Sequence, residues 1–183
     1  GTTVYDTANV TGYDPQMTVD SVAGEINRAI VVYRNTHTVI VDYYHIEARA
    51  YRSALLWGPV VVSSNAVSYN CLQPSITMAD NSIAADEIYV SWFDGRYFNP
   101  SGYSIFAQRL NNAGTVQWAA NGIRVSAPTS MGYDNALSMK LLYWNDGGSP
   151  YGVLPIWLDY RNKALNGTDI YYQKIDDTNA FIP

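Results

Sequence analysis

The chain has 183 residues, of which 48% are hydrophobic and 14% aromatic, and its formal net charge at pH 7 is -5. This length and composition suffice for a packed core in one or two domains, whereas an acidic chain without a cluster of Lys and Arg argues against nucleic-acid binding. The longest strongly apolar run, around residues 55–62, is too short and too interrupted to span a bilayer.

The amino-terminal residues 1–13 are predicted to form the fourth strand of a preceding or closing sheet. They lead into a Gly-Tyr-Asp tripeptide at 12–14, and the linker after the central part of the chain ends in the same tripeptide at 132–134. Because the chain has no leading methionine and no signal-peptide pattern, we expect a processed product or part of a longer protein. Unit one follows at residues 14–65. Its predicted strands are residues 14–20, 26–34, 41–51 and 60–63.

Unit two, residues 73–127, has the clearest strand signals. Residues 88–96 carry apolar and aromatic side chains on both faces of an extended chain, which is typical of a strand buried on both sides. Gly, Asn and Pro interrupt the chain at 99–102 and 111–114, where turns are expected. The unit therefore reads as four consecutive antiparallel strands. These are residues 75–78, 88–96, 103–110 and 122–126.

Unit three, residues 135–177, repeats features of unit two and is predicted to stop after its third strand. A W-x-D-x-R motif occurs in both units, and Trp57 and Trp118 each lead into a predicted fourth strand. The residues of this structural repeat are Trp92, Asp94, Arg96, Trp118, Trp157, Asp159 and Arg161. In unit one we align Arg34 with the arginine of the motif, so that Ile30 and Val32 replace its Trp and Asp.

The repeat period of about 60 residues predicts an all-β, propeller-like fold of three four-stranded antiparallel blades. Propellers typically have about four to eight blades, so we expect the chain to be part of a larger ring or oligomer. Two chains closing one ring, a larger parent protein and an open head-to-tail filament are the alternatives.

The succession of W-x-D-x-R, D-I-Y-x-Q and G-x-x-x-W motifs resembles the repeat of secreted bacterial β-propeller-like proteins. The resemblance covers units two and three well and unit one poorly. It implies an extracellular or cell-surface module that binds without catalysing a reaction. The FDGR and DIYYQ segments are also similar, more weakly, to the propeller repeats of periplasmic translocation proteins. The residues that carry the main resemblance are Trp92, Asp94, Arg96, Ile105, Gln108, Gly114, Trp118, Trp157, Asp159, Arg161, Asp169, Ile170, Tyr171 and Gln173.

Aromatic residues in or beside the predicted loops are the candidates for ligand binding. These are Tyr97, Tyr103, Trp144 and Tyr151. Flat apolar rings with polar edges can stack on sugar rings while neighbouring polar groups supply hydrogen bonds. In unit one, Glu47, Arg49 and Trp57 correspond in position to Phe106, Gln108 and Trp118 of unit two. The alternative is that the rings fill the space between sheets, and that the Asp–Arg pairs of the motif clamp a turn or a neighbouring blade.

Two chemical alternatives involve acidic residues and histidines. Asp20, Asp80 and Asp146 lie near the ends of the predicted first strands, where propeller glycosidases place paired carboxylates. His37, Asp42 and His45 could supply three metal ligands, although two histidines flanking a loop are more often a surface pair. Cys71 is the single cysteine, which excludes an internal disulfide and predicts a small buried residue. We predict no catalytic residues, no metal and no cofactor.

The sequence thus predicts a non-catalytic extracellular binding or adhesion module, with carbohydrate as the expected ligand class. One alternative is a structural subunit that assembles into a ring or filament by exchanging its terminal strands. A second alternative is a fragment of a propeller glycoside hydrolase. The expected partners are further copies of the chain or the remainder of a longer protein, and a glycan.

Overall fold

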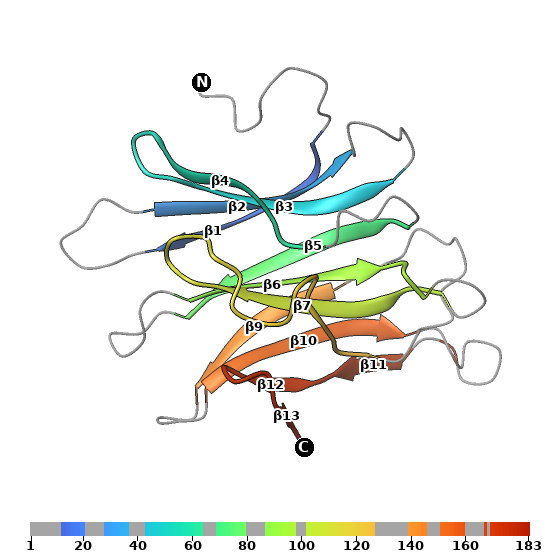
Figure 1. The fold of residues 1–183 in the computed structure, drawn as a ribbon. Helices are drawn as coiled ribbons and strands as arrows, with labels where there is room; N and C mark the ends of the chain where they lie inside the picture. The colour runs from blue at the N-terminus through green and yellow to red at the C-terminus, as the bar shows by residue number, and fades with distance from the viewer. Residues whose placement is uncertain are drawn as a thin grey trace.

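The computed structural model describes residues 12–20, 28–36, 43–63, 69–79, 87–97, 102–126, 139–145, 151–159, 167 and 169–183. In these ranges all regular elements are β-strands, and they form three antiparallel sheets (Figure 1). We call the sheets blade one, blade two and blade three in chain order. The predicted all-β fold with three propeller-like blades is confirmed.

Each blade is built from strands that follow one another in sequence. Blade one has the order β1 (Tyr13–Asp20), β2 (Arg28–Thr36), β3 (Tyr44–Tyr51) and β4 (Leu55–Val61). Blade two has the order β5 (Cys71–Met78), β6 (Ile88–Asp94), β7 (Ser104–Leu110) and β8 (Ile123–Arg124). Blade three contains β9 (Met139–Asn145), β10 (Tyr151–Asp159), β11 (Asp169–Tyr172), β12 (Lys174–Asp176) and β13 (Phe181–Ile182). Both β11 and β12 pair with β10, so together they form one interrupted third strand.

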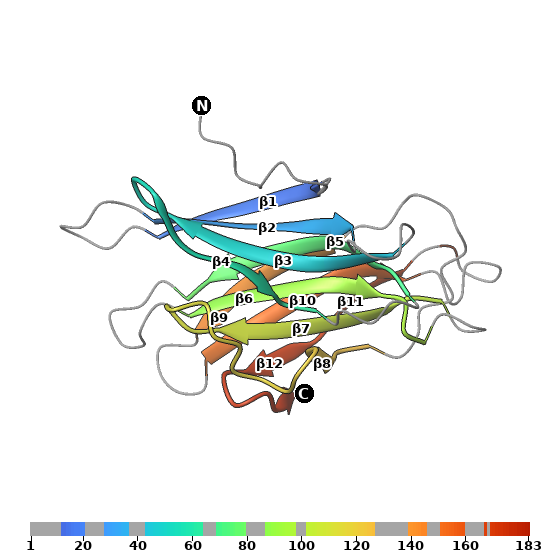
Figure 2. The same ribbon diagram turned by 45° about the horizontal axis from the view of Figure 1, so that its top comes forward.

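Blade two lies between the other two blades (Figures 1 and 2). Its central strand β6 is buried over its whole length, as the sequence predicted. Val90 and Trp92 belong to the apolar cluster shared with blade one. Tyr89 and Phe93, on the opposite face of β6, belong to the clusters shared with blade three. The alternating side chains of one strand therefore join all three sheets.

The pairing of the second and third strands shows which residues of the three blades are equivalent. The equivalent pairs are Arg34–Ile46, Phe93–Ile105 and Leu158–Ile170. Tyr33 and Asn35, and not Ile30 and Val32, thus occupy the positions of the Trp and Asp of the motif. The sequence alignment on arginine was wrong by an odd number of residues, and such a shift moves every side chain to the other face of the sheet. The buried side chains of Ile30 and Val32 accordingly pack toward blade two.

A β-bulge marks the same place in the first strands of blades one and two. Asp14 and Gln73 lie in these bulges, have φ angles of 51° and 46°, and each precedes a proline. A left-handed residue at a bulge bends the strand. Asp14 and Gln73 are 59 residues apart, which is the length of the repeat between the first two blades.

In blades one and two, a serine just after the fourth strand hydrogen-bonds to the third strand. The amide of Ile46 donates to Ser63 Oγ at 2.8 Å, and the amide of Ile105 donates to Ser126 Oγ at 2.9 Å. The residue before each serine donates its own amide to the carbonyl of the same isoleucine, at 2.9 and 2.8 Å. The fourth strand is thus held by the same hydrogen bonds in both blades.

Blade three continues beyond its predicted end with a turn equivalent to that of blade two. Asn111 Oδ1 accepts hydrogen bonds from the amides of Ala113 and Thr115 at 3.0 and 2.9 Å. Asp176 Oδ1 accepts from the amides two and four residues later at 2.9 and 2.8 Å. After this turn β13 pairs with β12, just as Val116 forms a bridge with Leu110.

Candidate functional site

The four aromatic residues predicted to bind a ligand form two separate pairs. Tyr97 and Tyr103 flank the connection from β6 to β7, and Trp144 and Tyr151 flank the connection from β9 to β10. β6 ends on the right of Figure 1 and β9 ends at the lower left, so the two connections lie at opposite ends of the blades. The structure therefore does not bring the four residues together.

Their rings are also engaged within the protein. Tyr97 is 48% exposed, but Arg124 lies 4.6 Å from its ring centroid and Phe106 stacks with it at 6.3 Å. Tyr103 packs against the cluster that joins blades two and three. Trp144 donates its indole N–H to the carbonyl of Val153 at 3.2 Å, and Lys174 Nζ lies 4.8 Å from its ring. Tyr151 is half-buried beside Tyr143, with ring centroids 6.4 Å apart.

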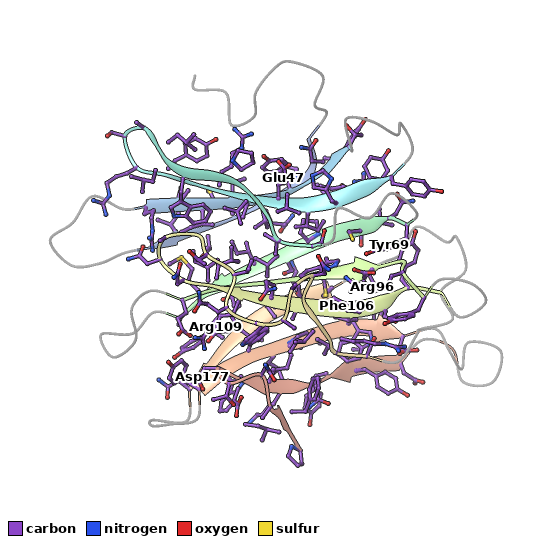
Figure 3. The ribbon with its side chains drawn as sticks, viewed as in Figure 1. Glu47, Tyr69, Arg96, Phe106, Arg109 and Asp177 are labelled. Atoms are coloured by element: carbon purple, nitrogen blue, oxygen red, sulfur yellow. The ribbon has the colours of Figure 1, made fainter. Side chains whose placement is uncertain are left out.

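The W-x-D-x-R residues of blade two form a buried brace centred on Asp94. Its carboxylate, which is fully buried, accepts from Trp92 Nε1 at 2.9 Å and from Arg96 Nε and Nη2 at 2.8 and 2.7 Å. Arg96 also donates to the carbonyl of Asn121 at 2.8 Å, which ties the end of β6 to the turn before β8. The Arg96 guanidinium lies 3.9 Å from the ring centroid of Phe106 (Figure 3).

The brace is partly repeated in blade three. Trp157 Nε1 donates to Asp159 Oδ2 at 3.3 Å, and Trp157 stacks on Tyr171 at 6.2 Å, the same separation as between Trp92 and Phe106. Arg161 lies outside the described residues. These contacts favour a structural role for the motif.

The two repeated tryptophans before the fourth strands join neighbouring blades. Trp57 Nε1 donates to the carbonyl of Asn112 in the turn of blade two at 2.9 Å. Trp118 Nε1 donates to the carbonyl of Asp177 in the equivalent turn of blade three at 3.1 Å. Arg109 adds a guanidinium donor to the Asp177 carbonyl (Figure 3). Each interface thus uses donors of one blade and a turn carbonyl of the next.

Blade one has a polar cluster where blade two has the rings of Trp92 and Phe106. Tyr33 donates its hydroxyl to Glu47 Oε2 at 2.8 Å, His45 Nε2 lies 2.9 Å from Glu47 Oε1, and Arg49 Nε donates to the Tyr33 hydroxyl at 2.7 Å. Tyr33 and Glu47 form a cross-strand pair, as the two rings do in blade two. The predicted equivalence of Glu47 and Phe106 is therefore confirmed.

Opposing effects set the pKa of Glu47. Burial alone would raise it, but hydrogen bonds from His45, Tyr33 and Asn35 together hold the pKa below its ordinary value. Burial and the contact with Glu47 raise the pKa of Tyr33. The carboxylate is thus ionised and fully engaged by its neighbours, an arrangement that serves to stabilise the sheet.

The remaining chemical candidates fall largely outside the described residues. His37, Asp42, Asp80 and Asp146 lie there, as does the side chain of Asp20. His45 contacts Glu47, as described above. Cys71 is buried as predicted, with a thiol pKa raised first by burial and then by the charge of Asp94. The metal-site and glycosidase alternatives therefore stay predictions.

The face of blade three that points away from blade two leaves apolar side chains exposed, and we call it the forward face. We define this face by Leu142, Ile170 and Tyr172, which are 49%, 72% and 66% exposed. The register makes Ile170 and Tyr172 equivalent to Ile105 and Ala107 of blade two. Those two residues are 0% and 1% exposed because they lie in the clusters shared with blade three.

The face of blade one that points away from blade two also leaves apolar side chains exposed, and we call it the rear face. We define it by Met17 and Val19, which are 62% and 48% exposed. Their equivalents in blade two are Ile76 and Met78, which pack against the cluster between blades one and two. Sequence reasoning missed both end faces, because each strand shows the same alternation whether or not another sheet covers it.

No protein-family model matches the chain, and no curated protein matches it. Among the residues that the structure describes, no helix is long and apolar enough to cross a membrane.

Proposed function

We propose that the chain is a non-catalytic assembly module that docks head to tail with copies of itself. The forward face of blade three packs on the rear face of blade one in a second copy. One observation supports this proposal: Ile170 and Tyr172 on one end face, and Met17 and Val19 on the other, are exposed, whereas their counterparts in blade two are buried or pack against a neighbouring blade.

The internal interfaces serve as the template for the docking. Ile76 and Met78 lie on the rear face of blade two and pack against blade one. In the docked assembly, Met17 and Val19 of one molecule pack in the same way against blade three of the next. Burying a large aliphatic side chain contributes about 1.5–3 kcal/mol. Docking removes three apolar side chains of one face and two of the other from water, so the hydrophobic effect favours the contact.

The contact joins two different faces and is therefore heterologous. Repetition of such a contact gives a ring if the rotation closes and a filament if it does not. The repeated residues Trp92, Asp94 and Arg96 hydrogen-bond to one another inside blade two. They stabilise the blade itself, which agrees with a structural module.

A mixing experiment tests the proposal. The forward face is blocked by Leu142→Glu with Tyr172→Glu, and the rear face is blocked in another sample by Met17→Glu with Val19→Glu. We expect the unaltered chain to assemble with rising concentration and each blocked variant to remain a monomer of 20.3 kDa. An equimolar mixture should form dimers and nothing larger, because the contact uses the one intact face of each variant and leaves only the two blocked faces free. Sedimentation velocity measures these masses.

The matched control is Val116→Glu, which places a charge at a 38% exposed residue on the outer edge of blade two. This variant should assemble like the unaltered chain. A chain that stays monomeric at high concentration, or blocked variants that still associate by themselves, would contradict the proposal.

A further inference from the structure

Within the part of the chain that the structure describes, the third strand of blade three has an open edge. Among the described residues β11 pairs only with β10. In blades one and two the corresponding edge of the third strand is covered by β4 or β8. β11 therefore presents a row of main-chain groups of the kind that accepts an added strand.

The residues equivalent to Ile170 show how a fourth strand would pair with this edge. Its equivalents Ile46 and Ile105 each direct the amide toward a serine hydroxyl of the fourth strand, and each carbonyl accepts an amide from the residue before that serine. Continued to their ends, the registers of β3–β4 and β7–β8 put each serine opposite the residue before the isoleucine. An added strand that reproduces this geometry therefore places a hydroxyl residue opposite Asp169, with its side chain beside the amide of Ile170.

We propose that residues 1–11 of a second copy add to the β11 edge as the fourth strand of blade three. This inference rests on the head-to-tail docking proposed above. In the chain, each fourth strand comes directly before the first strand of the next blade, β4 before β5 and β8 before β9. When blade one of a second copy docks on blade three, the segment that precedes its β1 has the same relation to β11.

The number of residues between the fourth strand and the next first strand indicates which threonine of residues 1–11 takes the place of the serine. Ser63 precedes the start of β5 by eight residues, and Ser126 precedes the start of β9 by thirteen. Thr2 and Thr3 precede the start of β1 by eleven and ten residues, within this interval. Thr7 and Thr11 precede the start of β1 by six and two residues, which is shorter than either internal connection. Thr2 or Thr3 therefore meets the amide of Ile170.

Disulfide cross-linking between full-length chains tests the inference. One sample carries Thr3→Cys and another carries Asp169→Cys, because residues directly opposite each other on paired strands lie at distances that a disulfide can bridge. On oxidation we expect the mixture to yield a covalent dimer of twice the chain mass, and each variant alone to yield none between these positions. The same experiment with Thr2→Cys identifies the register.

The matched control replaces Asp169→Cys by Thr115→Cys, an exposed residue of blade two. This control should give only background cross-linking. A chain that carries both Thr3→Cys and Asp169→Cys separates the two possible sources of the strand. Loss of thiols within a monomer would mean that the segment closes on its own molecule, and would overturn the inference.

The two proposals fail in different ways. If the mixing experiment gives dimers but neither Thr2→Cys nor Thr3→Cys cross-links to Asp169→Cys, the end faces dock and the strand exchange is wrong. If no dimers form, the docking itself is wrong. Replacing both threonines by valine removes the hydroxyl alone, and we expect assembly to become roughly fivefold weaker, the effect of one typical hydrogen bond.

Discussion

At the scale of single residues, the same structural position is filled by two different chemistries. In blade two it holds the stacked rings of Trp92 and Phe106, and in blade one it holds the hydrogen-bonded pair of Tyr33 and Glu47. Both solutions fill the centre of a sheet. The carboxylate of blade one makes the stability of that sheet depend on pH, because buried ionised groups must keep their partners.

The depressed pKa of Glu47 predicts a loss of stability in acid. A carboxyl whose pKa is lower in the folded than in the unfolded state stabilises the fold above its ordinary pKa of 4.5 and loses that contribution as the pH falls through the folded value. We expect Glu47→Gln to flatten the dependence of the free energy of unfolding on pH below the ordinary carboxyl pKa of 4.5. Urea unfolding at a series of pH values measures this.

Tyr33→Phe serves as the companion variant. It removes one of the donors that lower the pKa of Glu47, so the acid-induced loss of stability should be smaller and should be complete at a higher pH than in the unaltered chain. Identical pH profiles for the unaltered chain and Glu47→Gln would show that the carboxylate does not carry the effect.

At the scale of elements, turns carry the contacts between blades. The turn after β7 supplies the Asn112 carbonyl to Trp57, and it can approach that ring closely because Gly114 has no side chain. A Cβ on Gly114 would lie 2.7 Å from the Trp57 ring. This glycine is therefore needed both for its left-handed conformation and for the space that it leaves.

A pair of glycine variants separates these two requirements. Gly114 and Gly167 have φ angles of 79° and 84°, but a Cβ on Gly167 would meet nothing within 4 Å. Gly114→Ala should lower the free energy of unfolding by about 1–3 kcal/mol more than Gly167→Ala, which is the usual cost of overpacking. Chemical denaturation of both variants gives the difference. Equal losses would mean that the backbone conformation alone is responsible.

The sequence predicted most elements but could not fix how they pair. The alternation in 88–96 gave a doubly buried strand, and β6 is one. In unit one the arginine match at Arg34 was wrong, because an identical residue on the wrong face outweighed the alternation that determines pairing. The β-bulge at Asp14 would have set the alignment, since an Asp-Pro there and a Gln-Pro at the start of β5 break both strands at the same point.

At the scale of the whole molecule, the three blades differ in how well they are covered. Blade two is packed on both faces, whereas blades one and three each have an end face with exposed apolar residues. In a repeat protein each unit gains stability from its neighbours, so a unit with two neighbours opens least often. The candidate function depends on this difference, which no local sequence pattern encodes.

Hydrogen exchange should reveal the difference between equivalent strands. β6 and β10 hold the same place in their blades, but Leu154, Ile156 and Leu158 on the forward side of β10 are only half-buried. We expect amides of β6 to exchange at least about tenfold more slowly than those of β10 in the monomer, because local opening follows burial. Mass spectrometry of exchanged peptides measures both. Equal protection would indicate that the blades open as one unit.

The contacts between blades also have a direction. At both internal interfaces an indole N–H belongs to the earlier blade, and the carbonyl that receives it belongs to the later one. Two molecules related by a twofold axis would bring like groups against each other at such a contact. A fibre built on this plan is therefore polar, with one end that can be capped only by a first blade and another that can be capped only by a last, whereas a ring runs in one direction around its axis.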